Sequence, residues 1–390
     1  MFTKYCKLQE TKMSRFTQFL SLLLALLLAS CATAPKTLSR FDTHLHVDVP
    51  LKTEDMPGKD VDLGAAMRKA GMDGIVMTFA VDYITLKEKG QAYQRFQNGL
   101  DGQADMLKNS GLRLTLNGRH AKENLHKGIP VVIQAVEGGH FLEGDVKRLE
   151  EAYKRGLRVF CLLHDNDANP PLGDVYTNEP QFGGLTELGA AAIRECERLG
   201  ILVDLAHADD TTVKMALQVA TKPFVISHTG LNTRLGNDDF MAKMMFKRLI
   251  SPEMAKQVAN AGCVIGVWPH LAASPEEYAA NIKAMVDIVG IDHVCIGTDS
   301  KITPEYKEFD PEMMERIKKQ LAKEMPKDDG GKRREPPKQN LDAPNHVWNS
   351  ETEAFYPSVV KALKAQGFND SDIAKLVGGN FLRVFDAATK

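Results

Sequence analysis

The stretch FDTHLHVDVP, residues 41–50, combines a strand pattern with a dense set of histidines and carboxylates. Side chains on a strand point alternately to its two faces. The stretch therefore predicts a strand over Phe41–Val47, with all of its imidazole and carboxylate groups on one face. These groups belong to Asp42, His44, His46 and Asp48. Any two neighbours on that face could hold a single metal ion.

Seven more short apolar runs follow, and many are continuous rather than alternating, as expected of strands covered on both faces. They are Gly74–Phe79, Pro130–Val136, Leu157–Leu163, Ile201–Ala206, Pro223–Ser227, Cys263–Trp268 and His293–Thr298. Helix-periodic stretches between them include Leu63–Ala70, Asp145–Arg155, Glu187–Leu199, Thr211–Ala220, Ser251–Ala261 and Pro275–Val289. This alternation predicts an α/β fold, a (β/α)₈ TIM barrel, with a doubly wound open sheet as the alternative.

Several later strands also end in a histidine or a carboxylate. In a barrel the carboxyl ends of all strands meet at one rim, where active sites of this architecture lie. One such residue alone could be structural, but their occurrence at six strand ends predicts a site for Zn²⁺ or a similar ion. Beyond the first strand, the residues are Glu137, His164, His207, His228 and Asp299.

Composition narrows the class of protein. The 390 residues are 43% hydrophobic and 26% charged, as in ordinary globular proteins. The formal net charge of -2 leaves no basic excess to neutralise phosphates, which argues against nucleic-acid binding. No CxxC pair is present, so the isolated cysteines of the later chain are interpreted as buried apolar residues. These are Cys161, Cys196, Cys263 and Cys295.

Residues 1–30 have the pattern of a signal peptide. A basic stretch precedes the apolar run FLSLLLALLLA, Phe19–Ala29, which is too short to span a bilayer as a helix. The sequence LLLASC resembles the lipobox of bacterial lipoproteins, in which the cysteine is acylated; a plain signal peptide is the alternative. We therefore expect a lipid anchor at Cys31 in the bacterial cell envelope, on the outer membrane facing the periplasm, as the only membrane attachment.

The remaining chain is expected to form one domain. A tether over 31–40 leads into a barrel over 41–390. The segment KDDGGKRREPPKQ, Lys327–Gln339, is nearly devoid of apolar side chains and predicts a flexible insertion around 301–345. Helical patterning from Glu351 to Ala388 predicts closing helices that pack on the barrel.

A set of motifs runs in order from about Phe41 to Phe385: HVDVP, AVEGG, LLHDND, LVDLAH, VISHTG, DHVCIGTD and GGNFLRVF. This set resembles the membrane (renal-type) dipeptidases, peptidase family M19, within the amidohydrolase superfamily. The resemblance implies a metal-dependent hydrolase barrel with two zinc ions per chain, which cleaves dipeptides through a hydroxide that bridges the ions. A homodimer is compatible with it.

The resemblance also implies a ligand set for the two zinc ions. Glu137 would bridge them, His207 and His228 would complete one, and a pair from the first strand would complete the other. That pair is open. Alignment to HVDVP makes it His46 and Asp48, whereas alignment to DTH makes it His44 and His46.

Three further roles follow from the resemblance. His164 would bind the substrate or its oxyanion, and Asp299 would act as the acid and base. Arg248, in RLISPE, matches the arginine that binds the substrate carboxylate. The chain departs from the family after the eighth strand, where the family's acidic Asp-Phe-Asp-Gly reads Asp299-Ser300-Lys301-Ile302, and in a longer gap between His228 and Arg248.

Two other functions compete with a dipeptidase. An amidohydrolase acting on N-acyl amino acids, lactones or lactams would use the same metals, and a non-catalytic envelope lipoprotein would not need Asp299. Some polar residues are left outside the site. Asp204 is expected on the opposite strand face from His207, anchoring a helix, while His140 and His270 are expected at surface or supporting positions.

Overall fold

The computed structural model describes residues 38–47, 62–82, 86, 88–237, 239–302 and 354–390. Cys31, Asp48 and the segment Lys327–Gln339 lie outside these residues, as do the predicted signal peptide and most of the expected insertion. The described chain belongs to one compact unit that begins at Ser39. In the part of the chain described, no helix is both long and apolar enough to cross a bilayer.

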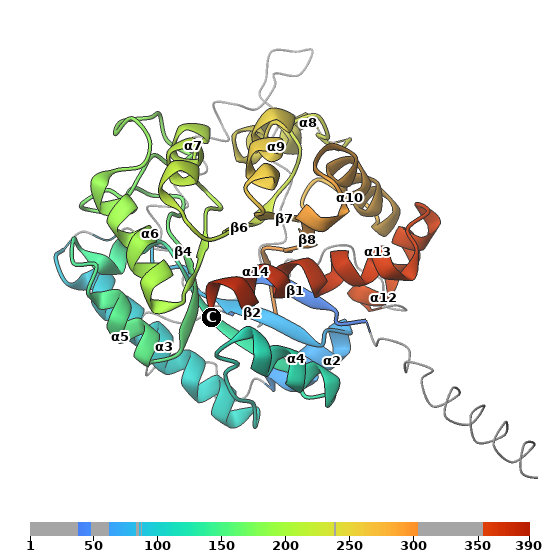
Figure 1. The fold of residues 1–390 in the computed structure, drawn as a ribbon, viewed down its shortest axis with the longest axis horizontal. Helices are drawn as coiled ribbons and strands as arrows, with labels where there is room; N and C mark the ends of the chain where they lie inside the picture. The colour runs from blue at the N-terminus through green and yellow to red at the C-terminus, as the bar shows by residue number, and fades with distance from the viewer. Residues whose placement is uncertain (1–37, 48–61, 83–85, 87, 238, 303–353) are drawn as a thin grey trace, which may run out of the picture. The chain divides into compact units, whose positions relative to one another are not determined.

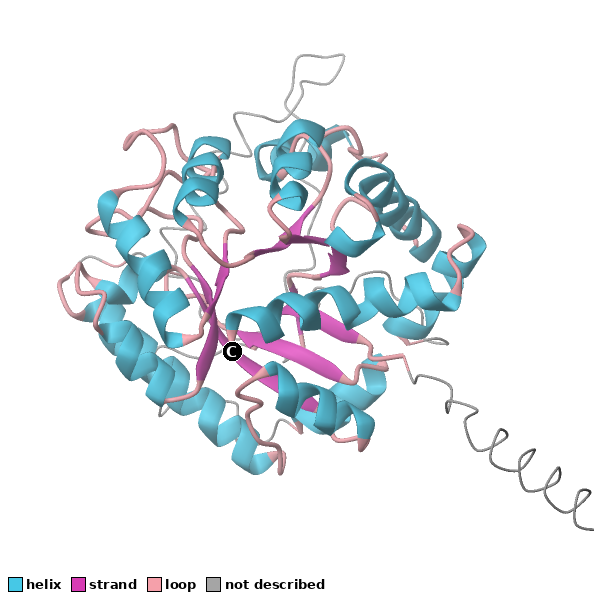
Figure 2. Cartoon of the chain, viewed as in Figure 1, coloured by secondary structure: helices cyan, strands magenta, loops and turns pink. Residues whose placement is uncertain are grey.

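All eight predicted strands form. They are β1 (Phe41–His46), β2 (Gly74–Thr78), β3 (Val131–Glu137), β4 (Leu157–Cys161), β5 (Leu202–Asp204), β6 (Val225–Thr229), β7 (Val264–Val267) and β8 (Val294–Ile296). Neighbours in sequence pair in parallel, and the sheet order is β8-β7-β6-β5-β4-β3-β2-β1-β9. Figure 1 shows the strands inside a set of helices, and Figure 2 shows the same layers by colour.

The sheet is closed by a short strand that the sequence did not predict. β9 (Ser300–Lys301) pairs with β1 and follows β8 after three residues. Asp299 N also donates to the carbonyl of His44 at 3.0 Å. Both ends of the strand order are therefore joined, which gives the barrel expected from sequence rather than the open-sheet alternative.

Helices lie between the strands along the chain. They are α2 (Leu63–Ala70), α3 (Gln91–Asn109), α4 (Gly118–His126), α5 (Arg148–Lys154), α6 (Glu187–Leu199), α7 (Asp210–Val219), α8 (Asp239–Met245), α9 (Pro252–Asn260) and α10 (Pro275–Val289). Their starts have clear local causes, since Ser251 and Ser274 cap α9 and α10 and a proline follows each cap. Neither α3 nor α4 is among the helices expected from the sequence.

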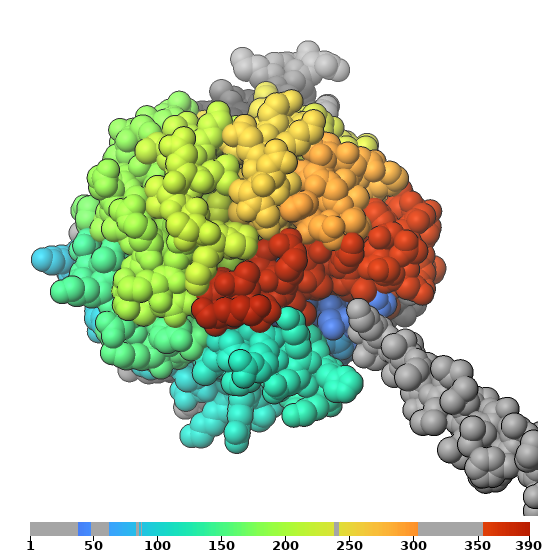
Figure 3. All heavy atoms as spheres, in the orientation of Figure 1, coloured from blue at the N-terminus to red at the C-terminus, as the bar shows by residue number. Residues whose placement is uncertain are grey.

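Closing helices follow, as predicted: α12 (Phe355–Ala365), α13 (Asp370–Ala374), a π-helical turn (Lys375–Gly379) and α14 (Asn380–Ala388). They cross the face of the barrel seen in Figure 3, where they are red. Phe381 stacks on Phe41 with ring centroids 5.1 Å apart. A Cβ at Gly378 would lie 2.3 Å from the carbonyl of Ser39, so only glycine permits this approach. α14 thus covers the amino end of the barrel.

Candidate metal centre

Glu137, the last residue of β3, lies at the centre of a ring of imidazoles. Its side chain is fully buried. Both of its oxygens face Nε2 atoms from four other strand ends, at 2.9 to 3.8 Å. The histidines are His44, His46, His164, His207 and His228. The predicted convergence of residues from separate strand ends is therefore present in the fold.

The donor set fits a bound cation. Neither oxygen of Glu137 accepts a well-formed hydrogen bond from the described residues, although burying an unsatisfied carboxylate is costly. His207 Nε2 and His228 Nε2 are 3.0 Å apart, and at most one of two such nitrogens can donate to the other. Lone pairs and carboxylate oxygens that face one another in a buried space are the arrangement that a divalent metal satisfies.

Hydrogen bonds on the outer sides of the rings hold the Nε2 atoms inward. The Nδ1 atoms of His44 and His228 both contact the Ser227 hydroxyl, at 3.1 and 2.9 Å. His207 Nδ1 contacts the Tyr176 hydroxyl at 2.7 Å. An Nδ1 partner fixes the tautomer and orientation of a metal-binding histidine. The sequence did not identify Ser227 or Tyr176, because both meet the rings only in the folded barrel.

On the first strand, the structure places His44 and His46 together with Glu137, and the three side chains form a group that could hold one ion. The Nε2 atoms of His44 and His46 are 3.3 Å apart. Asp48, the other candidate, lies outside the described residues. A second possible group shares Glu137 and adds His164 and His207, so His164 is also within reach of a metal ligand position.

The expectation that Asp42 shares a face with His44 is wrong. The pairing of β1 with β2 shifts register between Asp42 and Leu45, and such a bulge breaks the simple alternation of side chains. The Asp42 carboxylate instead accepts hydrogen bonds from Thr298 N at 3.0 Å and Thr298 Oγ1 at 2.8 Å. It fastens β1 to the end of β8.

Asp204 also differs from its expected role. It does not anchor a helix but lies inside the barrel, where Oδ1 accepts from the backbone N–H of Ser227 and of Ala206, each at 3.0 Å. Its Oδ2 is 3.7 Å from His44 Nδ1. Asp204 therefore supports His44 from behind.

Asp299 follows β8 and contacts the ring of imidazoles through His46. Its Oδ1 is 3.1 Å from His46 Nε2, and its Oδ2 is 3.6 Å from His270 Nε2. Its backbone φ of 51° and that of His207, 68°, are strained values for residues other than glycine. His270 is thus a supporting residue of the centre rather than a surface one.

His164 follows β4 and is held by a buried carboxylate that the sequence analysis missed. His164 Nδ1 is 2.5 Å from Asp82 Oδ1, while its Nε2 is 3.4 Å from Glu137 Oε2. Asn166 also donates to Asp82. His140 is buried close by, with Nε2 3.7 Å from Asp82.

Arg248 does not present an unpaired positive charge. Its Nη2 donates to both oxygens of Asp165, at 3.0 and 2.8 Å. Asp165 Oδ1 is also 3.2 Å from His207 Nδ1. The sequence placed Asp165 beside His164 in LLHDND, but nothing in that motif indicated a contact with a residue 83 positions later.

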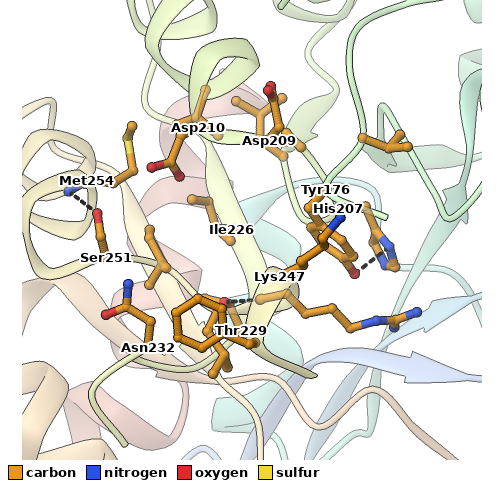
Figure 4. Close-up of a pocket in the computed structure, with 18 of the residues that line it drawn as sticks. Tyr176, His207, Asp209, Asp210, Ile226, Thr229, Asn232, Lys247, Ser251 and Met254 are labelled. Atoms are coloured by element: carbon orange, nitrogen blue, oxygen red, sulfur yellow. Dashed lines mark hydrogen bonds between the residues drawn. The ribbon is translucent and has the colours of Figure 1, made fainter. Parts of the chain in front are cut away.

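A cavity of about 360 Å³ lies beside this arginine. It reaches His207 and His228, and its outer walls come from α7 and α9 and from the loops before them. Figure 4 shows Tyr176 next to His207 on one side of it and Ser251 and Met254 on the other. The cavity is large enough for a small ligand that approaches the centre.

The electrostatics of the cluster favour positive charge at its centre. Burial raises the pKa of Glu137, but the imidazoles of His164, His44 and His207 outweigh burial and hold that pKa well below its usual value. Burial lowers the pKa of His44, and Glu137 and Asp204 reverse that effect and raise it well above normal. Burial lowers the pKa of His228 to about 3, which keeps this imidazole in the neutral, metal-binding form.

Known proteins that are similar to this chain include dipeptidases. Dipeptidase verJ of Clonostachys rogersoniana is 26% identical over 262 residues, which are 65% of this chain and 54% of that protein. The chain therefore matches about half the length of this relative. Two solved structures from Pseudomonas aeruginosa have the same fold. An amidohydrolase is 19% identical with a TM-score of 0.67, covering 90% of this chain and 97% of the other. The probable dipeptidase PvdM is 18% identical with a TM-score of 0.66, covering 91% and 96%.

The family comparison covers most of the chain and includes all the described residues of the centre. The model of the membrane dipeptidases, peptidase family M19, matches residues 35–325. This family is one of metallopeptidases, which implies a metal, and the side chains around Glu137 form groups that could hold one. The chain belongs to the membrane dipeptidase family, peptidase family M19.

Proposed function

We propose that this protein is a zinc-dependent dipeptidase that holds two zinc ions on either side of Glu137. The observation that carries the proposal is the buried Glu137 carboxylate, which is surrounded by five imidazole nitrogens yet accepts no well-formed hydrogen bond from the described residues. Both oxygens of Glu137 would be available to hold the ions, together with the nitrogens that face them. Histidine and carboxylate ligands suit zinc among the divalent metals.

The ligands divide into two sets around Glu137. His44 and His46 would hold one ion, and His207 and His228 the other. When bound, the ions supply Lewis-acid polarisation of the scissile carbonyl and lower the pKa of water. Burial lowers the pKa of His164, but Asp82 and Glu137 outweigh burial and raise it to about 10, so both ring nitrogens carry a proton. His164 would then donate from Nε2 to the carbonyl oxygen as negative charge develops there, while Nδ1 donates to Asp82.

Asp299 would move the proton. Burial raises its pKa, but the surrounding imidazoles, with His46 in direct contact, outweigh burial and keep that pKa well below its usual value, so the carboxylate is ionised at neutral pH. It would accept a proton from the attacking water and deliver it to the amine nitrogen of the leaving amino acid. The cleavage then yields two amino acids from one dipeptide and one water.

We also propose that the enzyme is tethered to the bacterial envelope through a lipid on Cys31. The lipobox-like sequence LLLASC supports this. Metabolic labelling with a palmitate analogue should label the wild type and leave Cys31→Ser unlabelled. Equal labelling of both would remove the proposal of an anchor without affecting the proposed activity.

Metal analysis together with dipeptide hydrolysis tests the proposed function. Two zinc ions per chain and turnover of Ala-Ala are expected for the wild type. Asp299→Asn should keep its zinc and lose nearly all turnover. Asp287→Asn is a matched control, because Asp287 lies on the exposed side of α10 in an ion pair with Lys283. Hydrolysis of N-acyl amino acids or lactones without hydrolysis of any dipeptide would contradict the proposal.

A further inference from the structure

The contact between Asp165 and Arg248 changes what the arginine can recognise. A guanidinium with no partner attracts a carboxylate strongly and can bind it through two parallel hydrogen bonds. Here Arg248 Nη2 already donates to both oxygens of Asp165. Its Nε and Nη1 make no hydrogen bond with any residue that the structure describes, and its side chain is 24% exposed. The arginine thus keeps free hydrogen-bond donors, while the pair that it forms with Asp165 carries little net charge.

The charged side chains around the arginine do not add a net positive charge to the cavity. Arg248 lines the cavity together with His207 and His228, so a substrate at the metal centre meets it directly. The other charged side chains of the cavity wall are Lys247, Glu179, Asp209 and Asp210. Lys247 is itself paired with Glu179 at 3.0 Å. The described side chains of the cavity wall thus include three carboxylates and two cations, so these side chains give a second anion no net attraction.

We propose that Asp165 is a specificity-determining residue: by neutralising Arg248 it directs the centre toward dipeptide-like amides whose far carboxyl group is uncharged. An amidated, esterified or peptide-linked carboxyl group offers a carbonyl oxygen that accepts a hydrogen bond from Arg248 without adding a negative charge next to Asp165. This inference rests on the proposed dipeptidase activity and names the substrate class of that same site.

The position of Asp165 makes the idea testable by a conservative change. Asp165→Asn keeps an oxygen that can accept from His207 Nδ1 and from Arg248, and Tyr176 still contacts the same His207 nitrogen at 2.7 Å. The change removes the negative charge and one of the two oxygens that accept from Arg248 Nη2. Asp167→Asn is the matched control, since it removes a charge from the same loop, where Asp167 contacts Asn178 and not Arg248.

The experiment compares Ala-Ala, its C-terminal amide and Ala-Ala-Ala by release of the N-terminal alanine from the zinc-loaded full chain. Wild type should cleave the amide at least as efficiently as Ala-Ala. Asp165→Asn should raise the ratio of kcat/KM for Ala-Ala to that for the amide by about tenfold, mainly through KM. Asp167→Asn should leave the ratio unchanged, and Arg248→Met in the Asp165→Asn background should abolish the gain.

The ratio is taken on one preparation, so partial misfolding of a variant cancels. The same ratio in Asp165→Asn and wild type, or a strong wild-type preference for Ala-Ala, would overturn the inference while the dipeptidase activity stood. Cleavage of neither substrate by the wild type would overturn the proposed function, and this inference with it. Turnover of Ala-Ala-Ala alongside the amide would identify longer peptides as substrates; turnover of the amide alone would restrict the class to small blocked dipeptides.

Discussion

The two ends of the barrel are built from the same strands, but different interactions hold each end together. At the amino end, Phe41, Val131 and Val225 pack into an apolar cluster with α14. At the carboxyl end, the same three strands carry His46, Glu137 and His228, whose charged or polar atoms face one another. Burial of apolar area stabilises the amino end, whereas the buried polar atoms of the carboxyl end need a cation as a partner.

This contrast separates stability from function within one sheet. Strained backbone occurs at the carboxyl end, at His207 and Asp299, while the opposite end is closed by stacked aromatic rings. Strained functional ends of strands persist when the rest of the structure overdetermines them. We therefore expect changes at the two ends to have separable effects on activity and on unfolding.

The largest effect is expected for Glu137→Gln. The amide cannot bridge two dications, so zinc content should fall and kcat/KM for Ala-Ala should drop by about a thousandfold or more. Metal analysis and steady-state kinetics check this. Glu150→Gln, an exposed change in a pair with Lys154, is the control and should leave both unchanged. Full zinc content in Glu137→Gln would show that this residue is not needed to bind the metals.

The opposite end is tested by Phe381→Ala. Phe381 is fully buried against Phe41 and Phe385, so its truncation should lower the free energy of unfolding by about 3 to 5 kcal/mol. Zinc content and kcat of the folded fraction should be unchanged. Chemical denaturation and activity on the same samples measure both. A loss of kcat as large as the loss of stability would show that the two ends are not separable.

The smallest of the three effects is expected for Ser227→Ala, which removes the hydroxyl shared by His44 and His228. Zinc affinity should weaken by about 10 to 100-fold, as is usual when a supporting hydrogen bond to a metal-binding histidine is lost. Competition with a chelator measures the affinity. Ser358→Ala on α12 is a matched control, because Ser358 is also buried and its hydroxyl donates to Phe355 within the same helix. Equal zinc affinity in Ser227→Ala and wild type would mean that Asp204 alone orients His44.

The sequence predicted the barrel and the convergence of its strand ends because both depend on patterns that are local to each strand. Mostly apolar runs such as Val131–Val136, which is followed by Glu137, required no knowledge of tertiary contacts. The alternation of side chains along a strand does not reveal the bulge in β1, so the sequence predicts the wrong face for Asp42. The pairing strand β9 is only two residues long, below what periodicity detects.

The supporting residues of the metal centre could not be predicted from the sequence, for a different reason. Asp82, Asp165 and Ser227 each contact a histidine that lies on another strand or loop, so their roles exist only in the folded chain. Asp204 was visible in the motif LVDLAH, but its inward orientation depends on hydrogen bonds to the next strand. Partners of this kind follow from geometry rather than from residue spacing.

Anomalous diffraction at the zinc edge, from crystals of the zinc-loaded protein, tests the central claim most directly. Two peaks are predicted, each about 2.0 to 2.2 Å from a different carboxylate oxygen of Glu137. One should lie next to His44 and His46, and the other next to His207 and His228. Zinc peaks that avoid Glu137, or a Glu137 that binds no ion while the protein hydrolyses dipeptides, would contradict the account.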